Sequence, residues 1–210
     1  MPFFDSGVTP AASSHLELAR DCCATVVAKS RNNAQAPIAQ LPGTMTVQPM
    51  PTISDLVHNG AIVKIDVELA PHDQPLRLLY GTPQFVAWLR EVLDGAQPDQ
   101  VLGHSSIAEQ IDDLFYSFLS GEQLIFTRQF RAVRAEENAV WELKTPDVRI
   151  FGWFMAKDCF VAVFGNWADT IKDHDLYRGY RIAIRRLRRE LGIDATLCVK
   201  GVAPDDVLSV

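Results

Sequence analysis

The stretch AVWELKTPDVRIFGWFMAKDCFVAVFGNW, residues 139–167, decides the fold. It contains three apolar segments, residues 139–145, 148–156 and 159–167, which are separated by the two-residue turns PD and KD. Short polar turns between runs of β-branched and aromatic residues are typical of β-hairpins. Together with the preceding segment QLIFTRQFRAVR, residues 123–134, the stretch predicts an antiparallel meander of three or four strands.

Upstream of this stretch, the sequence predicts two strands and two helices. Residues 61–69 alternate between polar and apolar side chains, and residues 75–81 form a short apolar run, so both segments are predicted to be strands. Residues 82–95 begin with Thr-Pro and end with Gly, and residues 106–121 begin with capping-box spacing, as helices do. The order predicts an α+β fold with helices packed on one face of the meander.

A basic helix is predicted from about residue 175 to residue 191. Apolar side chains recur at intervals of three and four residues and make a packing stripe: Tyr177, Tyr180, Ile184, Leu187 and Leu191. Arginines recur with the same period one residue further along: Arg178, Arg181, Arg185 and Arg188. The pattern predicts an uninterrupted cationic outer face that binds either RNA phosphates or an acidic protein surface. The tail, residues 193–210, is expected to add a strand and then to fray.

The N-terminal part of the chain differs from the rest. An amphipathic helix is predicted after Ser13 or Ser14, and a proline-rich stretch with few charges follows it. Residues 1–58 are therefore expected to form a helix and an arm, and residues 59–210 the α+β domain.

Composition narrows the classes of function. The chain is 48% hydrophobic and 22% charged, with no apolar run long enough to span a membrane and no pattern of a signal peptide at residues 1–10. A cytoplasmic protein without a membrane partner is expected. The four cysteines form no CxxC pair and lie apart from the histidines, so free thiols are expected, with neither a metal site nor another cofactor.

Charge is spread unevenly along the chain. The net charge is −6, yet residues 121–192 hold 13 basic and 10 acidic side chains, whereas residues 1–120 hold 6 basic and 13 acidic ones. A local basic region is therefore compatible with an RNA partner, because fields act over about a Debye length, ~8–10 Å.

Three short motifs carry a resemblance. They are Trp141-Glu142-Leu143, Arg149-Ile150-Phe151 and Phe164-Gly165-Asn166-Trp167, and an arginine-rich helix follows them. In order and spacing, they resemble the RelE/HigB-like toxin superfamily, and most closely its phage-derived HigB-like branch. The resemblance covers residues 139–191 in motif and roughly residues 60–192 in architecture. The branch has lysines where this chain reads Ala168-Asp169, and its members are smaller and basic.

The resemblance implies a metal-independent endoribonuclease that cuts mRNA on the ribosome and is neutralised by an antitoxin partner. Arg149 matches the strand arginine of the family and would hold the scissile phosphate. The implied catalytic set is Arg149, Lys172, His174 and Tyr177. The residues expected to bind RNA or the partner are Lys144, Arg178, Arg181, Arg185 and Arg188.

Several alternatives stay open at this stage. Arg149 either binds phosphate or pairs across the strands with Glu142, and His174 either catalyses or simply begins a helix. Trp141, Trp153 and Trp167 either stack on bases or fill the core. For the whole chain, the alternative to a ribonuclease is a catalytically silent module that engages a protein through its basic helix and N-terminal extension. In a third hypothesis, residues 1–58 act as a built-in antitoxin.

Overall fold

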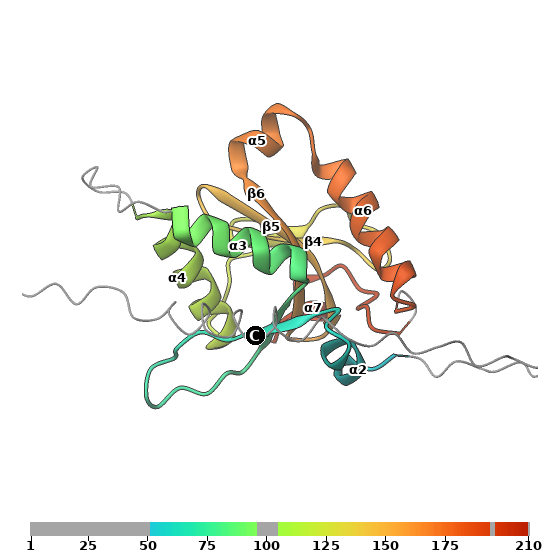
Figure 1. The fold of residues 1–210 in the computed structure, drawn as a ribbon, viewed down its shortest axis with the longest axis horizontal. Helices are drawn as coiled ribbons and strands as arrows, with labels where there is room; N and C mark the ends of the chain where they lie inside the picture. Colours follow the sequence, from blue (N-terminus) through green and yellow to red (C-terminus); the bar gives the residue numbers. More distant parts are fainter. Residues whose placement is uncertain (1–50, 96–104, 194–195, 210) are drawn as a thin grey trace, which may run out of the picture.

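The computed structural model describes residues 51–95, 105–193 and 196–209. They form an α+β fold around a six-stranded sheet of order β1-β2-β6-β5-β4-β3 (Figure 1). The strands are β1 Val63–Ile65, β2 Leu78–Gly81, β3 Phe130–Ala132, β4 Trp141–Lys144, β5 Val148–Ala156 and β6 Cys159–Trp167. The helices are α2 Ile53–His58, α3 Pro83–Gly95, α4 Ile107–Leu119, α5 Ala168–Asp173, α6 Tyr177–Glu190 and α7 Pro204–Val207.

The sheet is mixed rather than wholly antiparallel. From β3 to β6 each strand is antiparallel to its neighbour, but β2 runs parallel to β6. The meander predicted from the sequence therefore describes only part of the sheet. The physical reason lies in β6, whose segment from Cys159 to Val163 is buried on both faces. Such a strand needs hydrogen-bonding partners on both edges, and β2 occupies the edge that β5 leaves open.

Helices cover both faces of the sheet, so the predicted one-sided arrangement is wrong. One core contains Phe85 of α3 and Phe115 of α4, and the other contains Leu56 of α2 and Ile184 of α6. Figure 1 shows α3 and α4 on one side of the strands and α6 on the other. Successive residues of β5 and β6 are apolar, and a strand of this kind buries both of its faces.

The local signals for α3 and α4 are confirmed. α4 carries the predicted capping box, in which the Ser106 hydroxyl accepts from the Glu109 backbone N–H and the Glu109 carboxylate accepts from the Ser106 N–H. The basic helix is α6, preceded by the separate short helix α5, which the sequence analysis did not predict.

Both ends of the described chain pack against the domain. In the tail, residues 204–207 form α7 instead of the expected strand, and Val207 is fully buried. Near the N-terminal end of the described chain, Leu56 of α2 is fully buried, in a segment that the sequence assigns to the N-terminal arm. The predicted amphipathic helix after Ser13 or Ser14 and the proline-rich stretch up to residue 50 lie outside the described residues.

Candidate functional site

A polar cavity of about 760 Å³ lies between α4, the loop before β3 and the β4–β5 hairpin. Its volume is within the range of small-ligand sites. The cationic side chains that line it are Arg128, Lys144 and Arg149, and the acidic ones are Asp113 and Asp147. Two cations from one hairpin thus meet in a single hollow, and this cavity is the candidate site.

The hairpin register brings Lys144 and Arg149 together. These two residues are direct cross-strand partners on β4 and β5. The Arg149 guanidinium donates to the carbonyl oxygens of Thr145 and Val148, which bends it toward the turn at the rim of the cavity. The Lys144 ammonium group donates a hydrogen bond to the Thr127 carbonyl oxygen. Placing two like charges opposite each other costs free energy, and a bound anion would relieve that cost.

Burial lowers the pKa of Lys144, and the positive charges of Arg131 and Arg149 lower it further, against the opposing effect of Glu142. A lysine with a lowered pKa holds a larger fraction of neutral amine at a given pH, and a neutral amine can accept a proton.

The turn that ends the hairpin is fastened to α4. The Gln110 amide donates to the Asp147 carboxylate at 2.7 Å, and the Asp147 backbone N–H donates to the Gln110 carbonyl oxygen at 3.2 Å. The Asp147 backbone oxygen also accepts from Ala168 N–H at 2.7 Å. These bonds fix the wall of the cavity that carries Arg149.

Arg149 does not pair with Glu142, the alternative that the sequence suggested. Glu142 lies opposite Arg131 on one side and Phe151 on the other, and its fully buried carboxylate accepts from the Arg131 guanidinium. Burial alone would lower the pKa of Arg131, but the hydrogen bond and charge of Glu142 raise it. Arg149 is left facing Lys144 because the hairpin register is two residues away from the expected one.

Two tyrosines of α6, Tyr177 and Tyr180, pack against the strand residues Arg131 and Phe151, which flank Glu142. The Arg131 guanidinium is 5.6 Å from the centroid of the Tyr177 ring, and the Tyr180 ring stacks on Phe151 at 4.6 Å. The Asn166 amide donates to the Tyr180 hydroxyl at 2.8 Å. Asn166 is also the cross-strand partner of Arg149.

Sequence reasoning did not single out Arg131 or Asn166 as neighbours of the site, and it placed Tyr180 in the packing stripe. Strand periodicity was the signal that could have found them, because alternate residues of a strand lie on the same face of the sheet.

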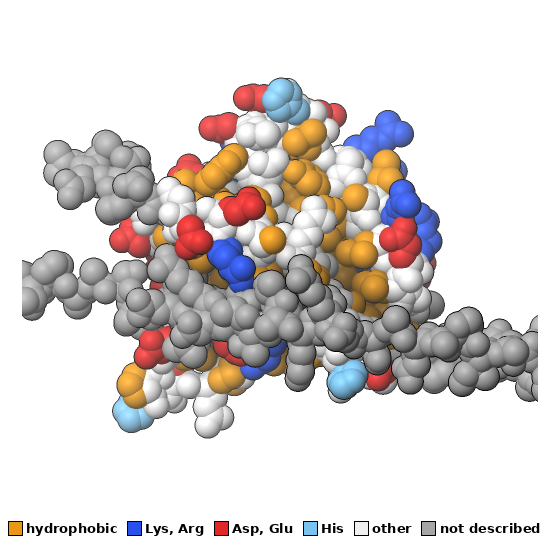
Figure 2. Space-filling model, viewed as in Figure 1, with side chains coloured by type: hydrophobic (Ala, Val, Ile, Leu, Met, Phe, Trp, Pro, Cys, Tyr) orange, Lys and Arg blue, Asp and Glu red, His pale blue; other side chains and the backbone are white. Residues whose placement is uncertain are grey.

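The structure separates the predicted catalytic set. Arg149 lines the cavity, while Tyr177 lies over Arg131 on β3, two strands away from the β5 strand that carries Arg149. Lys172 and His174 are exposed on α5 and at its C-terminal end, and neither lines the cavity. Lys172 forms an ion pair with Asp169 at 3.3 Å. Figure 2 shows acidic side chains beside a histidine over α5, a setting that repels phosphate.

The arginines of α6 do not form an uninterrupted outer face. Arg181 and Arg185 form ion pairs with Glu136 from the β3–β4 connection, at 2.9 and 3.1 Å. Burial alone would raise the pKa of Glu136, but the two arginines outweigh it and lower that pKa. Figure 2 shows basic side chains gathered over α6 with acidic ones beside them.

Arg188 is fully buried, which corrects its assignment to the binding surface. Its guanidinium donates to the Cys198 sulfur and to the Asn138 carbonyl, each at 2.8 Å. Arg178 is exposed, as are Arg186 and Arg189, and the exposed face of α6 also carries Ile182. The face of α6 that packs on the sheet is therefore not the one that the apolar period predicted. It is rotated toward the arginines, so that it includes Arg188.

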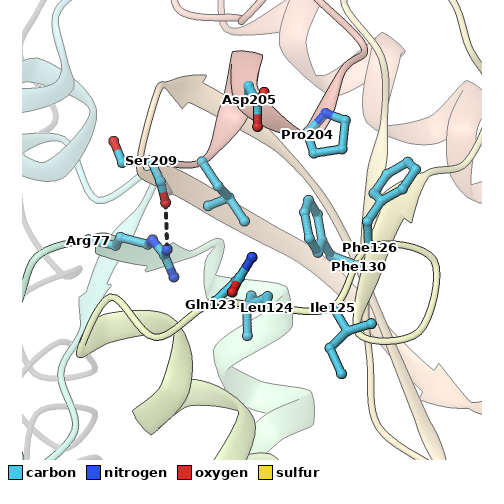
Figure 3. Close-up of a pocket in the computed structure, with 10 residues that line it drawn as sticks. Arg77, Gln123, Leu124, Ile125, Phe126, Phe130, Pro204, Asp205 and Ser209 are labelled. Carbon is cyan, nitrogen blue, oxygen red and sulfur yellow. Dashed lines mark hydrogen bonds between the residues drawn. The ribbon is translucent and has the colours of Figure 1, made fainter.

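A second cavity, of about 380 Å³, lies near α7 and is lined mainly by apolar side chains. Figure 3 shows Arg77 on one wall, joined to Ser209, with Phe126 and Phe130 on the opposite wall. The Arg77 guanidinium donates to five acceptors: the carbonyls of Phe118, Gly121, Glu122 and Ser209, and the Asp158 carboxylate. All of its N–H groups are engaged within the protein, so this arginine serves the fold rather than an anion.

Among the residues that the structure describes, no cluster of His, Cys, Asp or Glu is suited to hold a metal ion. Within the same residues, every helix is too short or too polar to cross a membrane. Comparison of the chain with protein-family models, curated proteins and solved structures finds no match.

Proposed function

We propose that this protein is a toxin-type endoribonuclease that holds an RNA phosphate between Lys144 and Arg149 and cuts without a metal ion. The observation that carries the proposal is the cross-strand pairing of these two cations in one polar cavity. The resemblance of residues 139–167 to the RelE/HigB-like superfamily supports it, because the strand arginine of that family corresponds to Arg149. An antitoxin that neutralises the protein and the ribosome that presents the mRNA are the partners this function implies.

The proposed chemistry needs a base and a phosphate clamp. Lys144, with its lowered pKa, accepts the proton of the ribose 2′-OH, and the 2′-oxygen then attacks the adjacent phosphorus. Arg149 stabilises the negative charge that develops on the phosphate oxygens. The bond from phosphorus to the 5′-oxygen breaks, and the products are a 2′,3′-cyclic phosphate and a 5′-hydroxyl end, which takes up a proton. Lys172 and His174 have no part in this scheme, because they lie on α5 and at its C-terminal end, among carboxylates.

Replacing Arg149 with alanine is expected to lower kcat for RNA cleavage by about 100-fold or more, the usual effect of removing one preorganised donor from a developing anion. The measurement is single-turnover cleavage of a single-stranded RNA in EDTA, with growth arrest on induction as the cellular counterpart. Arg134→Ala is the matched control, because this exposed arginine lies on the β3–β4 connection, outside the cavity and outside the predicted binding set. Wild-type protein that leaves RNA intact, or cleavage that Arg149→Ala does not change, would contradict the proposal.

The pH dependence tests the role of Lys144. A base must be neutral, so kcat/KM should rise about tenfold per pH unit while the pH is below the pKa of Lys144, and then level off. Because that pKa is lowered, the plateau should begin below the range of an ordinary lysine. Lys144→Arg keeps the charge but cannot lose its proton, so it should lower the rate by about 10²–10⁴-fold and abolish the rising limb. An unchanged profile in Lys144→Arg would remove Lys144 from the base role.

The second candidate function is a catalytically silent module that binds a protein through α6. It is favoured by one observation, the exposure of Ile182 among the arginines of the outer face, since apolar contact adds to charge in protein interfaces. The cleavage assay above separates the two functions, because this candidate predicts no turnover of RNA.

A further inference from the structure

We infer that Asp113 selects guanine, and that the cavity holds a guanine base against α4 while Lys144 and Arg149 hold the neighbouring phosphate. The inference rests on the proposed function, which supplies the phosphate site, and extends it by naming the base at which the RNA is cut. The cavity measures about 760 Å³, and sites of this size take whole small ligands rather than a single anionic group.

Two carboxylates line the cavity, and the fold uses the one that belongs to Asp147, which accepts from the Gln110 amide at 2.7 Å. Within the part of the chain that the structure describes, the Asp113 carboxylate forms no hydrogen bond or ion pair, although Lys144 and Arg149 line the same cavity. A carboxylate repels a phosphate, so a site for phosphate alone gains nothing from Asp113. A second part of the ligand, one that carries hydrogen-bond donors, would account for it.

One face of α4 forms the wall on which Asp113 lies. The spacing of three, four and seven residues places four side chains on the same side of this helix, and all four line the cavity: Gln110, Asp113, Leu114 and Ser117. Gln110 is the residue bonded to the hairpin turn at Asp147. Because an α-helix rises 1.5 Å per residue, Asp113 lies ~4.5 Å further along the axis of α4. The acid is thus displaced from the hairpin that carries the two cations, as a base is displaced from the phosphate of its nucleotide.

Apolar side chains beside Asp113 provide surfaces for the plane of a base. Leu114 lines the cavity from α4, and Ile125 lines it from the loop before β3. Ile125 is 53% exposed and belongs to neither of the two apolar cores, so packing of the fold does not use its surface. Bases held in protein pockets lie between apolar or aromatic side chains while their edges form hydrogen bonds.

The carboxylate determines which base fits. An ionised carboxylate has two oxygens that accept hydrogen bonds and no donor. Guanine offers it two adjacent donors, N1–H and the 2-amino group, so the two can form a parallel pair of charge-assisted bonds. On adenine and cytosine a ring nitrogen that accepts hydrogen bonds lies beside the amino group, and on uracil two carbonyl oxygens flank N3–H. Each of these three bases would place an acceptor against the carboxylate.

The test measures cleavage of short RNA strands that are 2′-O-methylated at every ribose except one, so that cleavage occurs at a single bond. Guanine, inosine, adenine, cytosine or uracil is placed in turn at the free ribose, and in a second series at the nucleotide that follows it. In one series, kcat/KM of full-length wild type should be about 10–100-fold higher for guanine than for the other three standard bases. Inosine should be intermediate, because its base keeps N1–H but lacks the 2-amino group.

Asp113→Asn should lower kcat/KM for guanine by about tenfold and remove most of the preference, because an amide turns a donor toward one of the two guanine donors. Asp113 is exposed, so this variant keeps the fold. Asp173→Asn is the matched control: it makes the same chemical change at an exposed position of α5, outside the cavity, and should leave the preference unchanged.

Equal kcat/KM of wild type for all five bases in both series would overturn the inference and leave the proposed function standing. So would an increase by the same factor for every base in Asp113→Asn, because it would mean that the carboxylate merely repels phosphate. A wild-type protein that cleaves none of the strands would overturn the proposed function. Binding of guanosine and inosine 5′-monophosphates then decides the inference: tighter binding of the guanosine nucleotide in wild type but not in Asp113→Asn would uphold the base site, and equal affinities would overturn it.

Discussion

Replacing Arg77 with methionine is expected to lower the free energy of unfolding by about 3–5 kcal/mol, the usual effect of removing one partner of a buried ion pair. Arg77 is only 3% exposed and is the point at which three segments meet: the end of α4, the β5–β6 turn and the C-terminal tail. Methionine fills a similar space but donates no hydrogen bond. The Asp158 carboxylate and the carbonyls that follow α4 would then be left partly buried without this donor.

The measurement is chemical denaturation of full-length protein followed by circular dichroism. Arg134→Met is the matched control, because Arg134 is exposed on the β3–β4 connection, and it should change the free energy of unfolding by less than about 0.5 kcal/mol. Arg77→Lys should be intermediate, since a lysine keeps the charge but cannot reach acceptors in so many directions. A loss below about 1 kcal/mol in Arg77→Met would show that the carbonyls find other donors, and that Arg77 does not hold the three segments together.

Replacing Gly152 with alanine is expected to cost about 3 kcal/mol or more, at or above the upper end for overpacking of a core. Gly152 lies in the centre of β5, where the register with β6 shifts. A Cβ atom at this position would overlap the carbonyl oxygen of Val161 on the neighbouring strand and would lie 2.7 Å from the Phe160 ring. The obstacle is backbone in the middle of a sheet, so the strands themselves would have to separate.

Gly179→Ala provides a control in which the same chemical change has the opposite sign. A Cβ atom at Gly179 would meet nothing within 4 Å, and the residue lies in α6. Alanine there should stabilise the protein by about 0.5–1 kcal/mol, because glycine loses more conformational freedom on forming a helix. Thermal unfolding of the two variants in one buffer checks the pair. Equal melting temperatures for wild type and Gly152→Ala would contradict the close approach of β5 and β6.

The elements with strong local signals could be predicted from the sequence. The capping box at Ser106 and the Thr-Pro start of α3 identified both helices, because capping depends on residues within one turn. The turns after Lys144 and Ala156 identified the β4–β5 and β5–β6 hairpins in the same way. The sequence did not lead to the prediction that helices cover both faces of the sheet. The signal was present, because β5 and β6 are apolar at successive positions, and this pattern indicates burial on both faces.

The candidate site was only partly predictable. Lys144 and Arg149 were both selected, one as a binding residue and one as a phosphate clamp, but their direct pairing depends on a register that the turn geometry determines. Lys172 and His174 were selected because they follow the motif along the chain, and α5 carries them away from the cavity. Exposure separated Trp167 from Trp141 and Trp153, and exposure is a property of the packed fold.

By itself the sequence determined the identity and approximate bounds of most helices and strands, because hydrophobic period, caps and turns act over a few residues. Only the tertiary structure decided that β2 lies parallel to β6, that Arg181 and Arg185 both form ion pairs with Glu136, and that Arg188 is buried. Each of these depends on residues distant in sequence, such as the 45 positions between Glu136 and Arg181. The periodicity of α6 could show that one face is apolar and another basic, but the acid that meets the arginines comes from the connection between β3 and β4.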